Sequence, residues 1–114
     1  MALQIVEKEV EGVTVLKFWG NIGLGEDSRR FREKVNEVLA AQKKRVVLDL
    51  ANVSYIDSAG LGVLVAAYTS AANQGAIIKL ASLTKLIRQQ LQITKLVTVF
   101  EVHETVEAAA QSFQ

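Results

Sequence analysis

The sequence lacks cysteine and proline and contains a single histidine. Without cysteine, disulfides, thiol nucleophiles and cysteine-ligated metal sites are excluded, and the redox compartment stays open. Internal repeats, low-complexity tracts and linkers are also missing from the pattern. The 114 residues therefore predict one domain spanning 1–114, large enough to bury a core without a metal or a disulfide.

Neither sign of charge dominates, because 13 Lys and Arg residues face 12 Asp and Glu residues, for a formal net charge of +1. This balance gives no reason to expect nucleic acid or an anionic membrane as a direct partner. A run of about 18 apolar residues is also missing, so we expect no direct membrane insertion. The start, Met1–Gln4, lacks a basic flank and a long apolar segment, which predicts a cytoplasmic protein without a secretory signal.

Strand and helix patterns alternate along the chain. Two β-rich segments flank Glu11-Gly12, a pair typical of a hairpin turn. Beyond them, apolar residues at helical spacing alternate with short apolar runs typical of buried parallel strands. This order predicts an α/β fold with an opening β-hairpin and a mixed, mostly parallel sheet packed by helices. The predicted strands are 3–9, 13–19, 46–50, 76–81 and 96–102, and the predicted helices follow 28, 58, 83 and 105.

Local signals mark where several of these elements begin and end. Asp27 or Ser28 is the expected N-cap of the first helix, after a glycine-rich loop at Gly20–Gly25. Gly75 is a plausible helix stop, and Thr105 is the expected cap of the last helix. The predicted core includes Val47, Leu48, Leu50, Leu64, Val65 and Ile78.

The segment Gly23–Ser28, GLGEDS, partly resembles a dinucleotide-binding fingerprint. It follows a predicted strand, precedes a predicted helix and has Asp49 about twenty residues farther on. However, Ser28 replaces the third glycine, and Glu26 and Asp27 would place carboxylates where a pyrophosphate must lie. The chain is also short for a two-half dinucleotide domain. We therefore interpret the segment as a loop.

A catalytic role for Ser58 finds little support in the sequence. A hydrolase elbow requires G-x-S-x-G, and the segment Ile56–Gly60, IDSAG, lacks the first glycine. A nucleophilic serine also needs a nearby base, but His103 lies between the last predicted strand and helix. Without a cluster of histidine or cysteine, a metal site is equally unsupported. We expect no enzyme, no catalytic residue, no cofactor and no metal.

The segment Asn52–Leu64, NVSYIDSAGLGVL, joins a buried strand to a helix. Asp57 and Ser58 are both suitable helix N-caps, and if Ser58 is the cap, Ser58→Ala costs about 0.5–2 kcal/mol. Gly60 and Gly62 each cost about 1 kcal/mol relative to alanine inside a helix. Such a cost indicates a close approach by a neighbouring strand or by a partner's backbone. The residues alone favour a plain N-cap with tight helix–sheet packing.

Residues 48–62, LDLANVSYIDSAGLG, resemble the signature of STAS domains, in particular the bacterial anti-sigma factor antagonists. The resemblance covers essentially the whole chain. It implies that Ser58 is phosphorylated by a partner that is both serine kinase and anti-sigma factor. The unphosphorylated form would bind this partner and free the sigma factor, and a metal-dependent serine phosphatase would restore it. The implied partner-binding residues are Tyr55, Asp57, Ser58, Ala59, Gly60, Leu61 and Asn21.

One departure from the family and two alternatives stay open. Family members often carry a Leu-Asp pair where this chain has the Gly20–Gly25 loop, so the contacts of that loop are in question. The same fold also serves scaffolds of signalling assemblies and small cytoplasmic subunits of lipid-transport complexes, because fold does not determine function. A third interpretation is a domain that holds an anion between this loop and the helix start at Ser58.

Overall fold

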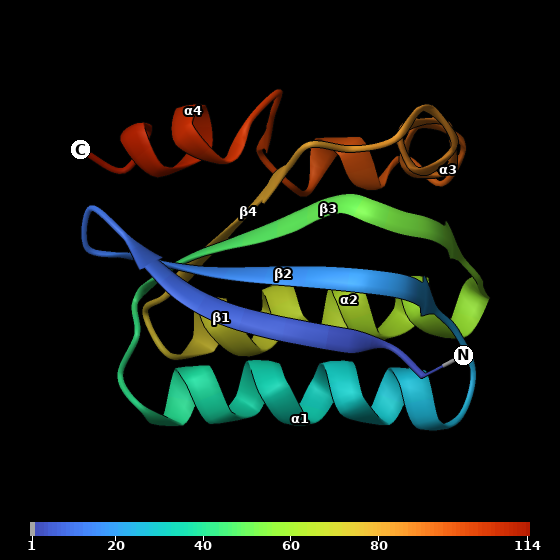
Figure 1. The fold of residues 1–114 in the computed structure, drawn as a ribbon, viewed down its shortest axis with the longest axis horizontal. Helices are drawn as coiled ribbons and strands as arrows, with labels where there is room; N and C mark the ends of the chain where they lie inside the picture. Colours follow the sequence, from blue (N-terminus) through green and yellow to red (C-terminus); the bar gives the residue numbers. More distant parts are fainter. Residues whose placement is uncertain (1) are drawn as a thin grey trace.

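The computed structural model describes residues 2–114 and shows a five-stranded sheet flanked by helices (Figure 1). The strand order is β1-β2-β3-β4-β5, with β1 antiparallel to β2 and the later neighbours parallel. The predicted α/β class with an opening hairpin is confirmed. The strands are β1 (Gln4–Val10), β2 (Val13–Ile22), β3 (Arg45–Ile56), β4 (Ile77–Ala81) and β5 (Val102–His103); the helices are α1 (Glu26–Ala40), α2 (Ser58–Asn73), α3 (Lys85–Ile93), the 3₁₀ helix η1 (Leu96–Thr98) and α4 (Val106–Gln111).

The opening hairpin turns at Glu11 and Gly12, as predicted. Both residues have positive φ angles, 51° and 81°, and Val10 pairs with Val13 across the turn. Tight turns of this kind match the right-handed twist of the strands they join. The hairpin places β1 at the edge of the sheet and β2 inside it.

Strands β2 and β3 run farther than predicted. β2 continues to Ile22, so the predicted Gly20–Gly25 loop is partly strand, and β3 continues from Leu50 to Ile56. The added segments pair with each other, and Ile22 lies opposite Ile56. The polar residues in this part of β3 resemble a loop locally, but pairing with a strand distant in sequence outweighs local propensity.

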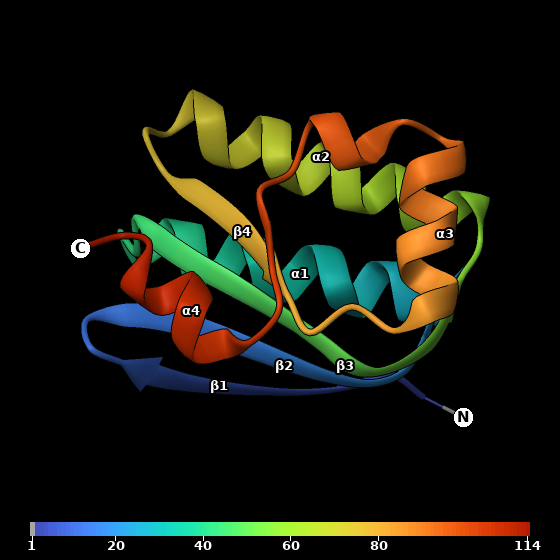
Figure 2. The same ribbon diagram turned by 90° about the horizontal axis from the view of Figure 1, so that it is seen from above.

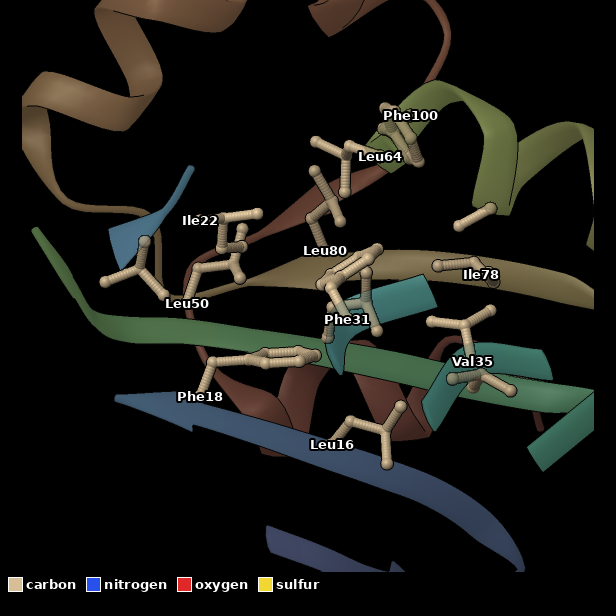
Figure 3. Packing of buried hydrophobic residues seen from close by; sticks show 14 of the residues in the cluster. Leu16, Phe18, Ile22, Phe31, Val35, Leu50, Leu64, Ile78, Leu80 and Phe100 are labelled. Atoms are coloured by element: carbon tan, nitrogen blue, oxygen red, sulfur yellow. The ribbon is translucent and has the colours of Figure 1, made fainter. Parts of the chain in front are cut away.

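Helices cover both faces of the sheet (Figures 1 and 2). The main hydrophobic core lies between the sheet and α1 and α2, and a smaller cluster lies under α4 on the other face. In the main core, Phe18 and Phe31 stack with ring centroids 5.2 Å apart (Figure 3). The pairing of β4 with β3 stops at Ala81, so β4 does not reach the far end of β3. Helix α3 lies beside that end (Figure 2).

The structure buries Val47, Leu48, Leu50, Leu64 and Ile78 of the predicted core. Val65 is only partly buried, so its assignment to the core was wrong. Helix α2 turns Gly60, Leu64, Ala67 and Ala71 inward. Val65 follows Leu64 by one residue and is therefore rotated by about 100° onto the flank of the helix.

The first helix begins earlier than predicted. It starts at Glu26, with Gly25 at the cap position in a left-handed conformation of φ 83°, so neither Asp27 nor Ser28 is the N-cap. Asp27 instead accepts a hydrogen bond from the Leu3 N–H, and the Ser28 hydroxyl donates to the Gly23 carbonyl. Both side chains hold neighbouring segments in place, which local sequence cannot reveal.

The predicted last strand, 96–102, is also wrong in most of its length. Lys95 adopts a left-handed conformation with φ 63°, and η1 follows it. The chain then buries Phe100 before forming the short strand β5. The β-branched residues in this stretch favour a strand locally, but packing of Phe100 against Tyr68 of α2 produces a turn instead. The predicted Thr105 cap is confirmed, since its side chain accepts from the Ala108 N–H.

A buried lysine fastens the last helix to the sheet. Lys79 of β4 donates from its Nζ to the Ser112 hydroxyl at 2.7 Å and lies 2.9 Å from Oε2 of Glu101. The same Nζ lies 4.1 Å from the centre of the Phe113 ring. Buried charges are tolerated when they are paired and hydrogen-bonded in this way. Lys79 and then His103, through their hydrogen bonds, lower the pKa of Glu101 from 4.5 to about 2.

This cluster predicts a stability change in acid. Because the pKa of Glu101 is lower in the folded chain, the carboxylate stabilises the fold above pH 4.5, and that contribution is lost as the pH falls towards about 2. We expect Glu101→Gln to lower the melting temperature near neutral pH and the two curves to converge in acid. Thermal unfolding followed by circular dichroism across this range is the measurement. Glu11→Gln, in the exposed hairpin turn, is the control, and identical pH profiles for wild type and Glu101→Gln would contradict the prediction.

Candidate functional site

The residues singled out by the sequence meet at the carboxyl ends of β2 and β3. These parallel neighbours end at Ile22 and Ile56, at the right of Figure 1, where the chain enters the loop before α1 and the start of α2. The N–H of Asp57 donates to the Ile22 carbonyl at 3.2 Å and so continues the contact between the strands beyond their last pair. The edge of the sheet thereby brings two loops and one helix start together.

The Asp57 carboxylate connects all of these parts. One oxygen, Oδ1, accepts from the Gly60 N–H at 2.8 Å and caps α2. The other, Oδ2, accepts from the Leu24 N–H in the β2–α1 loop at 3.0 Å. The choice between Asp57 and Ser58 as the cap is therefore decided for Asp57. Its negative charge also suits the positive N-terminal end of the helix.

Ser58 is left free by this arrangement. It is the first residue of α2 and its side chain is exposed. Within residues 2–114, its hydroxyl makes no hydrogen bond. A hydroxyl in this position can be modified without breaking a contact of the fold, and the helix N-terminus beside it favours a negative charge.

Packing requires glycine at position 60 but not at position 62. A Cβ at Gly60 would lie 2.0 Å from the Ile22 carbonyl oxygen and 2.8 Å from Cγ2 of Ile56, so only glycine lets α2 approach β2 this closely. A Cβ at Gly62 would meet nothing within 4 Å, and this residue is exposed. Packing within the chain thus requires Gly60 and leaves the helix-propensity cost of Gly62 without an internal cause.

The remaining predicted contact residues are buried to different degrees. Tyr55 is 48% exposed and lies opposite the exposed Asn21 in the pairing of β3 with β2. Ala59 and Leu61 are partly buried on α2. The structure therefore leaves Tyr55 and Asn21 exposed near the ends of β3 and β2 and gives buried Gly60 an internal packing role.

Sequence reasoning missed Leu24. This side chain is 81% exposed in the β2–α1 loop, although its N–H is held by Asp57. An exposed leucine between Gly23 and Gly25 is the one local signal that could have identified it. A large apolar side chain displayed on a fastened loop is suited to act as an anchor in a protein interface.

The residues that suggested a dinucleotide-binding loop or a catalytic serine with a histidine base have structural roles instead. The Leu24 N–H, which a phosphate would need in a dinucleotide loop, is already occupied by Asp57. Asp49 is buried and accepts from the Ala51 N–H, so it is not available to a ribose. His103 contacts Glu101 at 2.5 Å in β5 rather than Ser58.

Within residues 2–114, no group of three or more histidine or acidic side chains is placed to hold a metal ion. In the same part of the chain, every helix is too short or too polar to cross a membrane.

Comparison with known proteins gives one consistent result. The family model for the STAS domain matches residues 4–109. A Bordetella bronchiseptica protein named putative anti-sigma factor antagonist BtrV is 38% identical over 87 residues, covering 72% of this chain and 74% of the relative. A Thermotoga neapolitana protein, also named a putative anti-sigma factor antagonist, is 29% identical over 108 residues and covers 94% and 95% of the two chains.

Solved structures agree with this fold. The crystal structure of a putative anti-sigma factor antagonist from Thermotoga maritima matches with a TM-score of 0.87 at 26% identity, covering 95% of this chain and 92% of that one. The Bacillus cell fate determinant SpoIIAA, in its phosphorylated form, matches with a TM-score of 0.74 at 17% identity over 99% and 100% of the chains. At that identity, the second likeness shows the fold alone.

The two glycines of α2 provide a matched test of the site's geometry. We expect Gly60→Ala to destabilise the fold by about 1–3 kcal/mol or more, because the added methyl group collides with backbone that cannot move aside. Gly62→Ala should stabilise it by up to about 1 kcal/mol, because alanine is the better helix former and space is free. Urea unfolding measures both free energies. Equal effects of the two substitutions would contradict the assigned difference.

Proposed function

This chain belongs to the STAS domain family, and from that premise we propose that it is an anti-sigma factor antagonist switched by phosphorylation of Ser58. The names of its relatives support the first part of the proposal. The observation that carries the second part is the exposed, unbonded hydroxyl of Ser58 beside a helix cap already provided by Asp57. The chain acts by binding rather than by catalysis, and its place of action is the cytoplasm.

The proposed cycle has two partners. An anti-sigma factor that is also a serine kinase binds the unphosphorylated chain and releases its sigma factor. The kinase then transfers the γ-phosphoryl group of ATP to Oγ of Ser58, giving ADP and a proton. A metal-dependent serine phosphatase hydrolyses the phosphoserine to serine and inorganic phosphate. The chain itself is the substrate of both enzymes and carries one bit of information.

Phosphate on Ser58 should leave the fold nearly unchanged. It adds about −1.5 to −2 charges at pH 7. The N-terminus of α2 favours an anion by roughly 0.3–1 kcal/mol, and the neighbouring Asp57 carboxylate opposes it. These small terms have opposite signs, so the modification acts on binding rather than on stability.

The effect on binding is larger because an interface excludes water. A phosphate pressed against a partner must lose its hydration, and burying an unpaired charge costs several kcal/mol. Since about 1.4 kcal/mol corresponds to a tenfold change in affinity, we expect a loss of about two to three decades. Tyr55, Leu61 and Leu24 lie on the strand end, the helix start and the loop that meet where this charge appears.

Substitutions of Ser58 test the switch. Because Asp57 caps α2, Ser58→Ala should change stability by less than about 0.5 kcal/mol, in contrast to the larger loss expected if Ser58 were the cap. Ser58→Ala should keep partner affinity and resist phosphorylation, whereas Ser58→Asp should weaken binding, with one charge in place of nearly two. The measurement is calorimetry, with ATP or ADP present, against purified ATP-binding anti-sigma factor kinases from the same genome.

The matched control is Thr69→Asp, which adds the same charge at an exposed position three turns farther along α2. It should leave affinity unchanged. Equal affinities for Ser58→Ala and Ser58→Asp, with both variants folded, would rule out the switch. Co-purification with transport subunits instead of a kinase would favour the lipid-transport alternative.

The exposed leucine of the β2–α1 loop gives an independent test of the interface. We expect Leu24→Ser to weaken kinase binding by about tenfold, as loss of an apolar anchor typically does. The folding free energy should barely change, because the side chain is 81% exposed. Val6→Ser, at a 50% exposed position on β1, is the control. Unchanged affinity of Leu24→Ser would place the interface away from this loop.

A further inference from the structure

A long stretch of the chain carries no negative charge. Between Ser58 and Phe100 the sequence contains no Asp or Glu, so all acidic residues lie outside α2, β4, α3 and η1. The basic residues in this stretch are Lys79, Lys85, Arg88 and Lys95. Lys79 is buried and paired with Glu101, and Arg88 lies 3.6 Å from Glu104.

Lys85 and Lys95 differ from the other two cations. Both are exposed, one at the first residue of α3 and the other just after its end. Within residues 2–114, neither has a carboxylate within ion-pair distance. Helix α3 therefore displays positive charge at both ends without an acidic neighbour that would neutralise it.

Helix α3 is fastened directly to the strand that leads to Ser58. The side-chain amide of Gln90 accepts from the Ile56 N–H at 3.4 Å and donates to the Ile56 carbonyl. Since β4 has ended before this point, Gln90 satisfies the backbone groups that a neighbouring strand would otherwise pair. Figure 2 shows α3 beside the end of β3.

Apolar side chains flank Gln90 on the outside of α3. Leu86 is 45% exposed and Ile93 is 81% exposed, and they lie four residues before and three residues after Gln90. Leu86 and Ile93 are about two turns apart and lie on one side of the helix, next to the side from which Gln90 reaches Ile56. Tyr55, 48% exposed, immediately precedes Ile56, which Gln90 holds. Exposed apolar side chains thus stand both on the strand end that leads to Ser58 and on α3, and the two ends of α3 carry cations.

We propose that the α3 face, meaning the exposed side chains of Lys85, Leu86, Ile93 and Lys95 along and just after this helix, extends the Ser58 interface and docks an acidic segment of the protein partner that also carries apolar side chains. This inference rests on the proposed function. The charge of the face selects an acidic occupant, and its two exposed apolar residues select one with an apolar stripe. Opposite charges across an interface speed association and exclude partners of the wrong sign.

In this arrangement, phosphorylation of Ser58 also affects binding at the α3 face. A phosphate on Ser58 places nearly two negative charges at the first residue of a stretch, 58–100, whose formal charges are all positive. It thereby lowers the attraction of the α3 face for an acidic segment as well as blocking close contact at Ser58. Such an effect weakens as salt rises, because exposed charges are screened over about 8 Å at physiological ionic strength.

Charge reversal tests the proposal. The double variant Lys85→Glu/Lys95→Glu should bind the purified kinases described above about tenfold more weakly than wild type at low salt, with the difference shrinking as salt rises. The control, Lys8→Glu/Arg45→Glu, makes the same change in net charge at exposed positions on β1 and at the start of β3. It should leave affinity within about twofold of wild type, since it lies outside the interface.

Loss of the apolar contact is tested separately. Ile93→Ser should weaken binding by about tenfold, with Val6→Ser as the control, and Leu86→Gln replaces it if Ile93→Ser fails to fold in circular dichroism. Unchanged affinity of the charge-reversal and apolar variants, while Ser58→Asp still weakens binding, would overturn the α3 interface alone. If Ser58→Asp also has no effect, or no kinase binds, the proposed function fails.

A membrane surface is the occupant that the test must distinguish. Vesicles of phosphatidylcholine and phosphatidylglycerol in equal parts serve as the probe for a basic and apolar face that meets anionic lipid. The proposal expects no vesicle binding by wild type in a flotation assay. Vesicle binding that disappears in Lys85→Glu/Lys95→Glu, with kinase affinity unchanged, would overturn it.

Discussion

The geometry of the site depends on one carboxylate that holds two segments 33 residues apart in sequence. Asp57 caps α2 through the Gly60 N–H and fastens the β2–α1 loop through the Leu24 N–H. Hydrogen bonds to a charged group contribute about 1.5–3 kcal/mol each, more than neutral ones. The loop and the helix start are thereby held as one unit, and Ser58 is displayed without taking part in the contacts that hold it.

Close packing of α2 and polar contacts of α3 also hold the region around Ser58 in place. α2 can lie against the end of β2 only because Gly60 has no side chain, and any Cβ there would meet the Ile22 carbonyl. On the other side, Gln90 of α3 takes over the backbone groups of Ile56 where β4 no longer reaches. Ser58 therefore stands on elements anchored by backbone and polar contacts, which suits a surface that a partner must recognise in one conformation.

Charge is unevenly distributed along the chain. The overall balance of +1 conceals a stretch from Ser58 to Phe100 without any acidic residue. A phosphate at its first residue would introduce the opposite sign at the border of that stretch, next to Asp57. The proposed switch thus uses local electrostatics, and the fold contributes a rigid support rather than a moving part.

Local sequence determined the alternation of strands and helices, the hairpin at Glu11-Gly12 and the helix start at Asp57-Ser58, because each follows from periodicity or from turn and cap chemistry among near neighbours. Only the tertiary structure decided which of Asp57 and Ser58 caps α2, since both fit the local pattern. The same holds for η1 in place of a longer strand, and for the roles of Leu24 and Gln90. Apart from the short-range bond between Gly60 and Asp57, these features rest on contacts between residues more than about twenty positions apart, and local propensity contains no information about such pairs.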